Sequence, residues 1–314
     1  MEVSSHALML GRVQGVKFDV AGFTNLSQDH LDFHATMAEY FEAKALFFRP
    51  GSPTRAAQAV VCVDDEWGEK MASVFGSGVR TLATRGQAGD YTVSAVQINE
   101  RGGQEFRLAA PSGSVVAATV PLPGRFNVAN AALALALADT VGVDMTALLP
   151  GLAGVGVPGR MEVVDCGQDF LAVVDYAHKP AAIQAVLATV RGQVTGRIGL
   201  VVGAGGDRDH SKRPIMGAEA AAGADYVVVT DDNPRNEDPA AIRAQVLAGT
   251  TSGSAEVVEI GDRRAAIRQV VAWAKPGDAV IIAGKGHEVG QLIDGVTHHF
   301  DDREELRAAL EGRD

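Results

Sequence analysis

The sequence has few aromatic residues, only two cysteines and no long hydrophobic run. Aromatic residues make up 5% of its 314 positions, whereas glycine occurs 36 times. This balance is typical of α/β proteins with many tight turns. Two cysteines give no disulfide framework, and both Cys62 and Cys166 stand in apolar, strand-like runs. We therefore expect buried structural thiols and a reducing, cytoplasmic location.

Positive charge is also scarce, and no segment is suited to a membrane. The chain has 28 Lys and Arg against 39 Asp and Glu, a formal net charge of -11. Binding of nucleic acid is not expected at this charge, and an anionic ligand needs local basic groups. The longest apolar run, 131–138, is too short to span a bilayer. The N-terminus lacks the basic and apolar regions of a signal peptide, so we expect none.

The first half of the chain predicts a mixture of short strands and amphipathic helices. Its predicted strands are 19–24 and 59–63, and its predicted helices are 36–48, 66–75 and 122–141. In residues 79–120, apolar and polar side chains alternate and glycines interrupt the pattern. This predicts antiparallel strands with turns at Gly89 and Gly102-Gly103. The glycine-rich stretch 151–159 is the predicted linker. We expect one domain over 1–157 and a second over 158–314.

The second half predicts a parallel, doubly wound α/β sheet. Predicted strands are 162–166, 171–175, 197–202, 225–230, 256–260 and 278–283, and predicted helices are 180–191, 213–222, 239–248 and 262–274. Polar segments follow four of these strands, at 175–178, 203–208, 230–235 and 284–288. Because ligands bind at the carboxyl ends of parallel strands, these segments predict a single site.

The segment TDDNPRNEDP (230–239) has three possible interpretations. A calcium loop is excluded because Arg235 takes a ligand position and the required glycine is missing. A helix cap by Asn236 or Asp238 explains 236–239 but leaves 231–235 unexplained. The remaining interpretation is a site for a ligand that carries both an amine and a carboxylate.

Other motifs stay open on their pattern alone. GAGGDRD (203–209) is either a tight turn or a phosphate loop, although its glycines do not fit GxGxxG. GKGHE (284–288) is either a polar turn or a close backbone approach to a ligand. DHLDFH (29–34) is dense in possible metal ligands, and Glu2 with His30 could share a divalent ion. Lys44 follows the pattern of a solvated side chain on an amphipathic helix.

Taken together, these stretches resemble the Mur ligase family, the ATP-dependent amide-forming enzymes of bacterial peptidoglycan synthesis. They are EVSSHAL (2–8), FTNLSQDHLDFH (23–34), Lys44, LPGRFNVANA (122–131), PGRMEVV (158–164), VVDYAHKP (173–180), GAGGDRDHSKRP (203–214), TDDNPR (230–235) and GKGHE (284–288). The resemblance implies a central ATP-binding domain followed by a Rossmann-like C-terminal domain. It also implies phosphorylation of a carboxylate by ATP, attack by an amine, and Mg²⁺ to neutralise the phosphates.

The resemblance assigns roles residue by residue. It makes Lys44 a lysine carbamylated by carbon dioxide, which with Glu2 and His30 holds Mg²⁺. The residues that resemble nucleotide contacts are Asn127, Asn130, Arg160, Asp175 and His178. Ser4 and Arg12 resemble contacts to the UDP-N-acetylmuramoyl peptide.

The remaining assignments concern the incoming amino acid. The residues that resemble its pocket are Arg208, Asp232, Asn233, Arg235, Gly284 and Glu288. The DNPR form is associated with meso-2,6-diaminopimelate, whose far end carries an ammonium for Glu288 and a carboxylate for Arg235. The expected second substrate is UDP-N-acetylmuramoyl-L-alanyl-D-glutamate. Alternatives are a lysine-adding relative, which has no partner for Arg235, and a folylpolyglutamate-type ligase, which should not carry DNPR.

The sequence departs from the family in three places. The family's uridine-binding first domain and its GxxGKT phosphate loop are absent, and neither Lys179 nor Lys285 stands in the context of that loop. Leu10 replaces a glutamine that is often found there. We therefore expect a monomeric piece of a longer enzyme that is inactive alone, and a non-catalytic binding fragment is the alternative.

Overall fold

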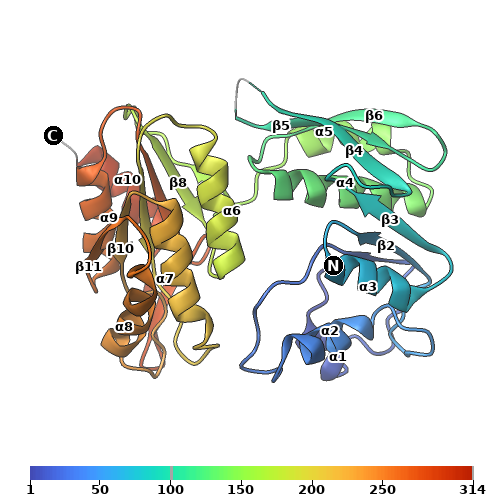
Figure 1. Cartoon of the computed structure of the whole chain (residues 1–314), viewed down its shortest axis with the longest axis horizontal. Coiled ribbons are helices and arrows are strands. Elements are labelled where there is room, and N and C mark those ends of the chain that lie inside the picture. Colours follow the sequence, from blue (N-terminus) through green and yellow to red (C-terminus); the bar gives the residue numbers. More distant parts are fainter. Residues whose placement is uncertain (100–101, 313–314) are drawn as a thin grey trace. The chain divides into compact units, whose positions relative to one another are not determined.

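The computed structural model describes residues 1–99 and 102–312, and the chain forms two compact units. The first unit comprises residues 1–27 and 33–156, and the second comprises residues 28–32 and 157–314 (Figure 1). Each unit has its own six-stranded sheet. The short segment 28–32 leaves the first unit and packs with the second.

The sheet of the first unit is mixed, with strand order β1-β2-β3-β4-β5-β6. Its strands are β1 (Val20–Phe23), β2 (Gln58–Cys62), β3 (Val79–Ala83), β4 (Tyr91–Ile98), β5 (Gln104–Ala109) and β6 (Val115–Val120). Pairing is parallel from β1 to β4 and antiparallel from β4 to β6. The prediction of antiparallel pairing from residue 79 is therefore wrong at β3. This strand follows a helical crossover from β2, and such a crossover joins parallel strands.

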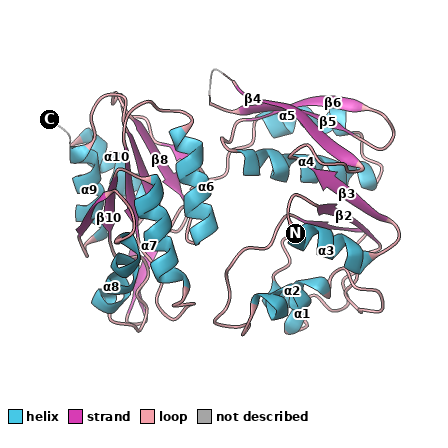
Figure 2. Cartoon of the chain, viewed as in Figure 1, coloured by secondary structure: helices cyan, strands magenta, loops and turns pink. Residues whose placement is uncertain are grey.

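Helices cover both faces of this sheet (Figure 2). They are α1 (Ser5–Met9), α2 (Met37–Ala45), α3 (Glu66–Phe75), α4 (Arg125–Thr140) and α5 (Met145–Ala153). Strand β2 alternates between the two hydrophobic clusters, because Val60 belongs to the cluster of α4 whereas Ala59 and Val61 belong to that of α1 to α3. Helix α5 runs through the first part of the predicted linker, so the linker prediction is wrong up to Ala153.

The second unit confirms the predicted doubly wound sheet, with strand order β11-β10-β9-β12-β8-β7. Its strands are β7 (Glu162–Val163), β8 (Leu171–Asp175), β9 (Ile198–Val202), β10 (Tyr226–Val229), β11 (Glu256–Glu259) and β12 (Ala279–Ala283). Every pairing is parallel except that of the short edge strand β7. Strands β9, β10 and β12 are buried along their whole length, as expected for a sheet covered on both faces.

Five helices cover the second sheet in two layers. They are α6 (Pro180–Arg191), α7 (Lys212–Gly223), α8 (Pro239–Thr250), α9 (Arg263–Trp273) and α10 (Asp302–Glu311). Helices α6, α7 and α8 pack side by side on one face, and α9 packs with α10 on the other (Figure 1). Asp238 caps α8 by accepting a hydrogen bond from Ala240 N at 3.0 Å, which confirms the capping interpretation of residues 236–239.

Several features of the structure were not predicted. A hairpin of β13 (Gly290–Ile293) and β14 (Val296–His299) follows the GKGHE segment, and α1, α5 and α10 are additional helices. Cys166 is exposed, so its predicted burial is wrong, because its strand ends at Val163. Cys62 is buried in β2, and this burial raises the pKa of its thiol to about 12. None of the helices in the described part of the chain is long and apolar enough to cross a membrane.

Candidate functional site

The four polar segments of the second unit emerge at one edge of its sheet. They follow β8, β9, β10 and β12, which lie side by side in the order β10-β9-β12-β8 and run parallel. The carboxyl ends of these strands therefore lie together, as predicted. The segments after β10 and β12 are in direct contact and form the centre of the site.

Lys285 lies at this centre, although the sequence did not single it out as a site residue. It is fully buried, and its Nζ donates to Asn233 Oδ1 at 2.9 Å and to Glu288 Oε2 at 3.4 Å. Asp232 Oδ1 lies 4.0 Å from the same nitrogen. Asn233 Nδ2 donates to Glu288 Oε2 at 2.9 Å. We call these four residues, Asp232, Asn233, Lys285 and Glu288, the Lys285 cluster.

Gly284 lets the two segments approach one another. Its φ is +124°, and a Cβ added there would lie 2.5 Å from Asp232 Oδ2. Gly286 has the same role on the other side, because a Cβ there would lie 2.7 Å from Gly159 O. Any side chain at either position would push the GKGHE segment away from its neighbours. Gly284 is therefore placed at the site, with a packing role.

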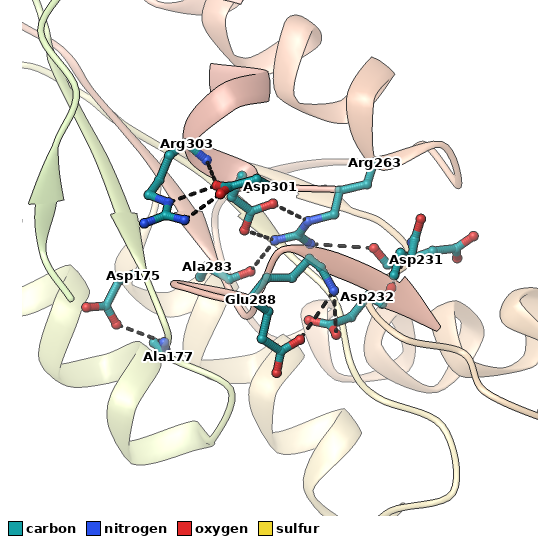
Figure 3. A network of polar contacts seen from close by, with 12 residues as sticks. Asp175, Ala177, Asp231, Asp232, Arg263, Ala283, Glu288, Asp301 and Arg303 are labelled. Atoms are coloured by element: carbon teal, nitrogen blue, oxygen red, sulfur yellow. Dashed lines mark hydrogen bonds and ion pairs between the residues drawn. The ribbon is translucent and has the colours of Figure 1, made fainter. Parts of the chain in front are cut away.

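A buried ion pair fixes the ends of β10 and β12 beneath the cluster. Arg263 donates to both oxygens of Asp302, at 2.8 and 2.7 Å, and both side chains are completely buried. Arg263 Nη2 also donates to Ala283 O at 2.9 Å, and Nη1 to Asp231 O at 3.5 Å (Figure 3). Burial disfavours the charged guanidinium, but the pair with Asp302 outweighs this and raises the pKa of Arg263.

The hairpin β13–β14 holds the turn that carries Arg235. Arg235 N donates to Leu292 O at 2.9 Å, and Asp294 N donates to Arg235 O at 2.7 Å. Leu292 N donates to Asn233 Oδ1 at 2.9 Å. This support allows Arg235 its positive φ of 55°. Asp294-Gly295 between two short strands is a recognised hairpin signal, so the sequence contained the information for this element.

The guanidinium of Arg235 is partly engaged within the unit. Its Nη1 donates to Gly206 O at 2.7 Å, and a Cβ at Gly205 would lie only 2.8 Å from that nitrogen. No hydrogen bond joins Nε or Nη2 to another of the described residues. One edge of the guanidinium is therefore held in place, and the other has donors for a ligand carboxylate.

The GAGGDRD segment packs against the DNPR turn, which favours a turn over a phosphate loop. Gly206 N donates to Asn233 O at 2.9 Å, and Gly205 O accepts from Arg213 Nη2 at 3.0 Å. Arg213 is completely buried and forms a two-bonded pair with Glu237, at 2.9 and 2.8 Å. This pair lowers the pKa of Glu237 to about 2. Arg208 is exposed, and its Nη1 donates to the neighbouring Asp207 O at 3.0 Å.

The predicted nucleotide contacts of the second unit lie around β8. Asp175 is buried, and its two oxygens accept from Met161 N and Ala177 N, both at 2.8 Å. Burial raises the pKa of Asp175, although these two bonds oppose the shift. The guanidinium of Arg160 lies 4.3 Å from the centre of the Tyr176 ring. Their roles in binding a nucleotide stay predictions.

The segment 28–32 places His30 and its neighbour Asp29 in the second unit. The carboxylate of Asp29 lies 3.1 Å from Lys179 Nζ, 3.5 Å from Lys212 Nζ and 3.8 Å from His178 Nε2. Burial acts to raise the pKa of Asp29, but His178 and the two lysines lower it overall. His30 Nε2 lies 3.5 Å from the same carboxylate.

The other predicted metal ligands belong to the first unit. Glu2 is exposed, and Lys44 lies on α2 with its Nζ 5.2 Å from the centre of the Tyr40 ring. Within the described ranges, no three His, Cys, Asp or Glu side chains gather where they could hold a metal ion. The proposed magnesium site of Glu2, His30 and Lys44 therefore stays a prediction.

The remaining predicted residues of the first unit make local contacts. Ser4 Oγ caps α1 by accepting from Ala7 N at 3.1 Å, and Arg12 is exposed. Asn127 is buried in α4, where its Nδ2 donates to Pro123 O at 2.8 Å, and Asn130 is exposed. Their roles in binding substrates also stay predictions.

Comparison with known proteins connects both units to one family. Residues 1–138 match the Mur ligase middle domain, and residues 159–286 match the Mur ligase glutamate ligase domain. The UDP-N-acetylmuramoyl-L-alanyl-D-glutamate–2,6-diaminopimelate ligase of Corynebacterium glutamicum is 61% identical over 316 aligned positions, and the alignment covers 99% of this chain and 61% of that protein. The protein of the same name from Corynebacterium efficiens is 62% identical, covering 99% and 60%.

A solved structure supports the same relationship. A UDP-N-acetylmuramoyl-L-alanyl-D-glutamate–2,6-diaminopimelate ligase superposes with a TM-score of 0.60 at 40% identity, over 99% of this chain and 63% of that one. This chain thus spans about three fifths of the length of its relatives. With both units matched and the resemblance of the motifs confirmed, the chain belongs to the Mur ligase family.

Proposed function

We propose that this chain is part of an ATP-dependent ligase that adds meso-2,6-diaminopimelate to UDP-N-acetylmuramoyl-L-alanyl-D-glutamate in peptidoglycan synthesis. The names of two relatives that are 61% and 62% identical support this function. The observation that carries it is the arrangement of Arg235, Asn233 and Glu288 at the carboxyl ends of β10 and β12. We further propose that the protein acts as a monomer in the cytoplasm.

The charges of these side chains complement the far end of the diamino acid. On one edge of its guanidinium, Arg235 has donors that bond to none of the described residues and suit a carboxylate. Glu288 has a side chain that is 35% exposed and can accept from an ammonium. An ammonium and a carboxylate on one carbon atom are the groups that this pair requires. Lysine has the ammonium at its far end but no carboxylate there, so it leaves Arg235 without a partner.

The proposed reaction has two chemical steps. ATP first transfers its γ-phosphoryl group to the side-chain carboxylate of D-glutamate. The amine of the diamino acid then attacks the carbonyl carbon, so that a C–N bond forms, the C–O bond to phosphate breaks and the nitrogen loses a proton. The second unit contributes by holding the diamino acid in position, which favours the attack by proximity. Magnesium would neutralise the charge that gathers on the phosphates when it is bound.

A calorimetric titration of this chain with meso-diaminopimelate and with L-lysine tests the binding step. We expect saturable binding of diaminopimelate and an affinity for lysine at least tenfold weaker. A phosphate-release assay on the full-length protein then tests turnover with each amino acid. Preference for lysine in both measurements would contradict the proposed specificity, and binding of neither would contradict the proposed site.

A further inference from the structure

The Lys285 cluster brings three charged side chains together where the segments after β10 and β12 meet, and packing of these segments does not require charge. Lys285 is fully buried, and Asp232 is 7% exposed. A lysine is almost never fully buried unless its charge is paired, because removing an ammonium from water is costly. Packing alone would be satisfied by an apolar side chain of similar volume. The position of this ammonium therefore calls for a role beyond filling space.

Hydrogen bonds in the cluster determine which way the amide of Asn233 points. Its Oδ1 accepts from Lys285 Nζ and from Leu292 N, both at 2.9 Å, and both of these groups are donors only. The amide nitrogen must then face Glu288, where Nδ2 donates to Oε2 at 2.9 Å. The amide oxygen of Asn233 is thus fully used within the cluster. Asn233 links Lys285 to Glu288, because it accepts from one and donates to the other.

The same bonds fix one oxygen of Glu288 and leave the other available. Oε2 accepts from Asn233 Nδ2 at 2.9 Å and from Lys285 Nζ at 3.4 Å. Among the residues that the structure describes, none forms a hydrogen bond with Oε1. The carboxylate is therefore held through one oxygen and can accept from an incoming group through the other.

The charge of Lys285 also keeps two carboxylates compatible within one pocket. Its Nζ lies 3.4 Å from Glu288 Oε2 and 4.0 Å from Asp232 Oδ1. Without the ammonium, two like charges would remain close together, and Glu288, the more exposed of the two, would turn towards water. The pocket would then lose the oriented carboxylate.

We propose that Lys285 is a positioning residue of the amino-acid pocket, which holds Glu288 through Asn233 so that Oε1 of Glu288 faces the ammonium at the far end of the diamino acid. This inference rests on the proposed function and deepens it. Lys285 does not touch the ligand. Its ammonium organises the side chains that do, before the ligand arrives.

A double-mutant cycle with Lys285→Met and Glu288→Gln tests this inference. The quantity measured is the dissociation constant for meso-diaminopimelate, by calorimetric titration of this chain. We expect each single variant to weaken binding by about 10- to 100-fold, the range for losing a hydrogen bond to a charged group. We expect the double variant to bind no more than about threefold more weakly than Glu288→Gln, because Lys285 acts through Glu288. Losses that multiply in the double variant would overturn the inference.

Kinetics of the full-length protein separate positioning from a general structural role. Lys285→Met should raise KM for diaminopimelate by a similar factor while leaving KM for ATP unchanged. A loss that affects both substrates equally would show that Lys285 only maintains the fold. Lys275→Met is the matched control, since Lys275 is an exposed lysine that precedes β12. It should change neither constant.

Thermal unfolding shows whether each variant is folded. Should Lys285→Met fail to fold, Lys285→Gln replaces it, because glutamine can still donate to Asn233 but has no charge. Normal binding by a folded Lys285→Gln would overturn the inference. If the wild-type chain does not bind diaminopimelate, the proposed function fails and the inference fails with it. If the wild type binds and Lys285→Met binds equally well, only the inference fails.

Discussion

In the second unit, the candidate residues Asn233 and Glu288 bond to each other across two segments, whereas in the first unit Asn127 and Ser4 make local bonds. Asn233 joins Lys285 to Glu288 across the ends of two strands. In the first unit, Asn127 donates to Pro123 O four residues earlier, and Ser4 caps its own helix. The side chains of the Lys285 cluster are therefore bonded to one another without a ligand. The hydrogen bonds of Asn127 and Ser4, by contrast, are local ones within about four residues.

This difference has a cause in the topology. Parallel strands bring segments that are distant in sequence to the same edge of a sheet, so Asp232 and Lys285 become neighbours. In α4, by contrast, Asn127 and Asn130 are near one another simply because they share a helix. A preformed network should make substitutions in the second unit affect both stability and binding. Substitutions at exposed positions of the first unit should affect binding alone.

The largest effect is expected from breaking the buried ion pair beneath the pocket. Arg263→Met leaves the carboxylate of Asp302 buried without its partner, which costs about 3–5 kcal/mol of the free energy of unfolding. The neighbouring pair of Arg264 and Glu305 is a matched control, because the side chain of Arg264 is 51% exposed. Arg264→Met should cost far less, because this guanidinium faces solvent. Urea unfolding measures the free energy of unfolding of both variants. An equal decrease in the two would contradict the idea that the buried pair of Arg263 and Asp302 stabilises the site.

Two substitutions, one in each unit, should have opposite effects on the affinities for diaminopimelate and ATP. Arg235→Lys should weaken binding of meso-diaminopimelate about 10- to 100-fold, since an ammonium cannot replace the two-donor edge of a guanidinium. It should leave the affinity for ATP unchanged. Asn130→Ala, on the exposed side of α4, should weaken ATP binding and leave diaminopimelate binding unchanged. Titration of the full-length protein with both ligands measures these effects. If either variant lost the same affinity for both ligands, the proposal that the first unit binds ATP and the second binds diaminopimelate would be contradicted.

Sequence periodicity was sufficient for helices in both units. Helix α6 of the second unit occupies the predicted residues 180–191, and α3 of the first unit occupies the predicted 66–75, because apolar residues recur at helical spacing in both. The doubly wound sheet follows from the alternation of strands and helices. The antiparallel prediction for β3 was wrong because alternation within a strand carries no information about the direction of its neighbour.

Only the site residues that stand within recognisable motifs could be predicted from the sequence. The motifs DNPR and GKGHE marked Asn233, Arg235 and Glu288, and the structure brings Asn233 and Glu288 into direct contact. Burial of Lys285 could not be predicted, because lysine in a polar turn is normally exposed. The pairing of Arg263 with Asp302 joins residues 39 positions apart, and only the packing of α9 against α10 brings them together.

The smallest effect concerns acid stability and the support of the GAGGDRD segment. Glu237 has its pKa lowered to about 2 by Arg213, from an ordinary value near 4.5. A carboxyl group whose pKa is lower in the folded state stabilises the fold fully above its unfolded pKa and loses that contribution as the pH falls towards 2.

Glu237→Gln should therefore lower the free energy of unfolding at pH 7 by about 1–2 kcal/mol, after allowance for solvent screening. It should also make the free energy of unfolding depend less on pH between 5 and 3. Thermal unfolding of wild type, Glu237→Gln and the exposed control Glu311→Gln across this range measures the difference. A slope as steep in Glu237→Gln as in the wild type would mean that other carboxylates govern acid unfolding. The DNPR turn would then keep its geometry without the Arg213 pair, and the preformed character of the pocket would rest on the Lys285 cluster and the Arg263 pair alone.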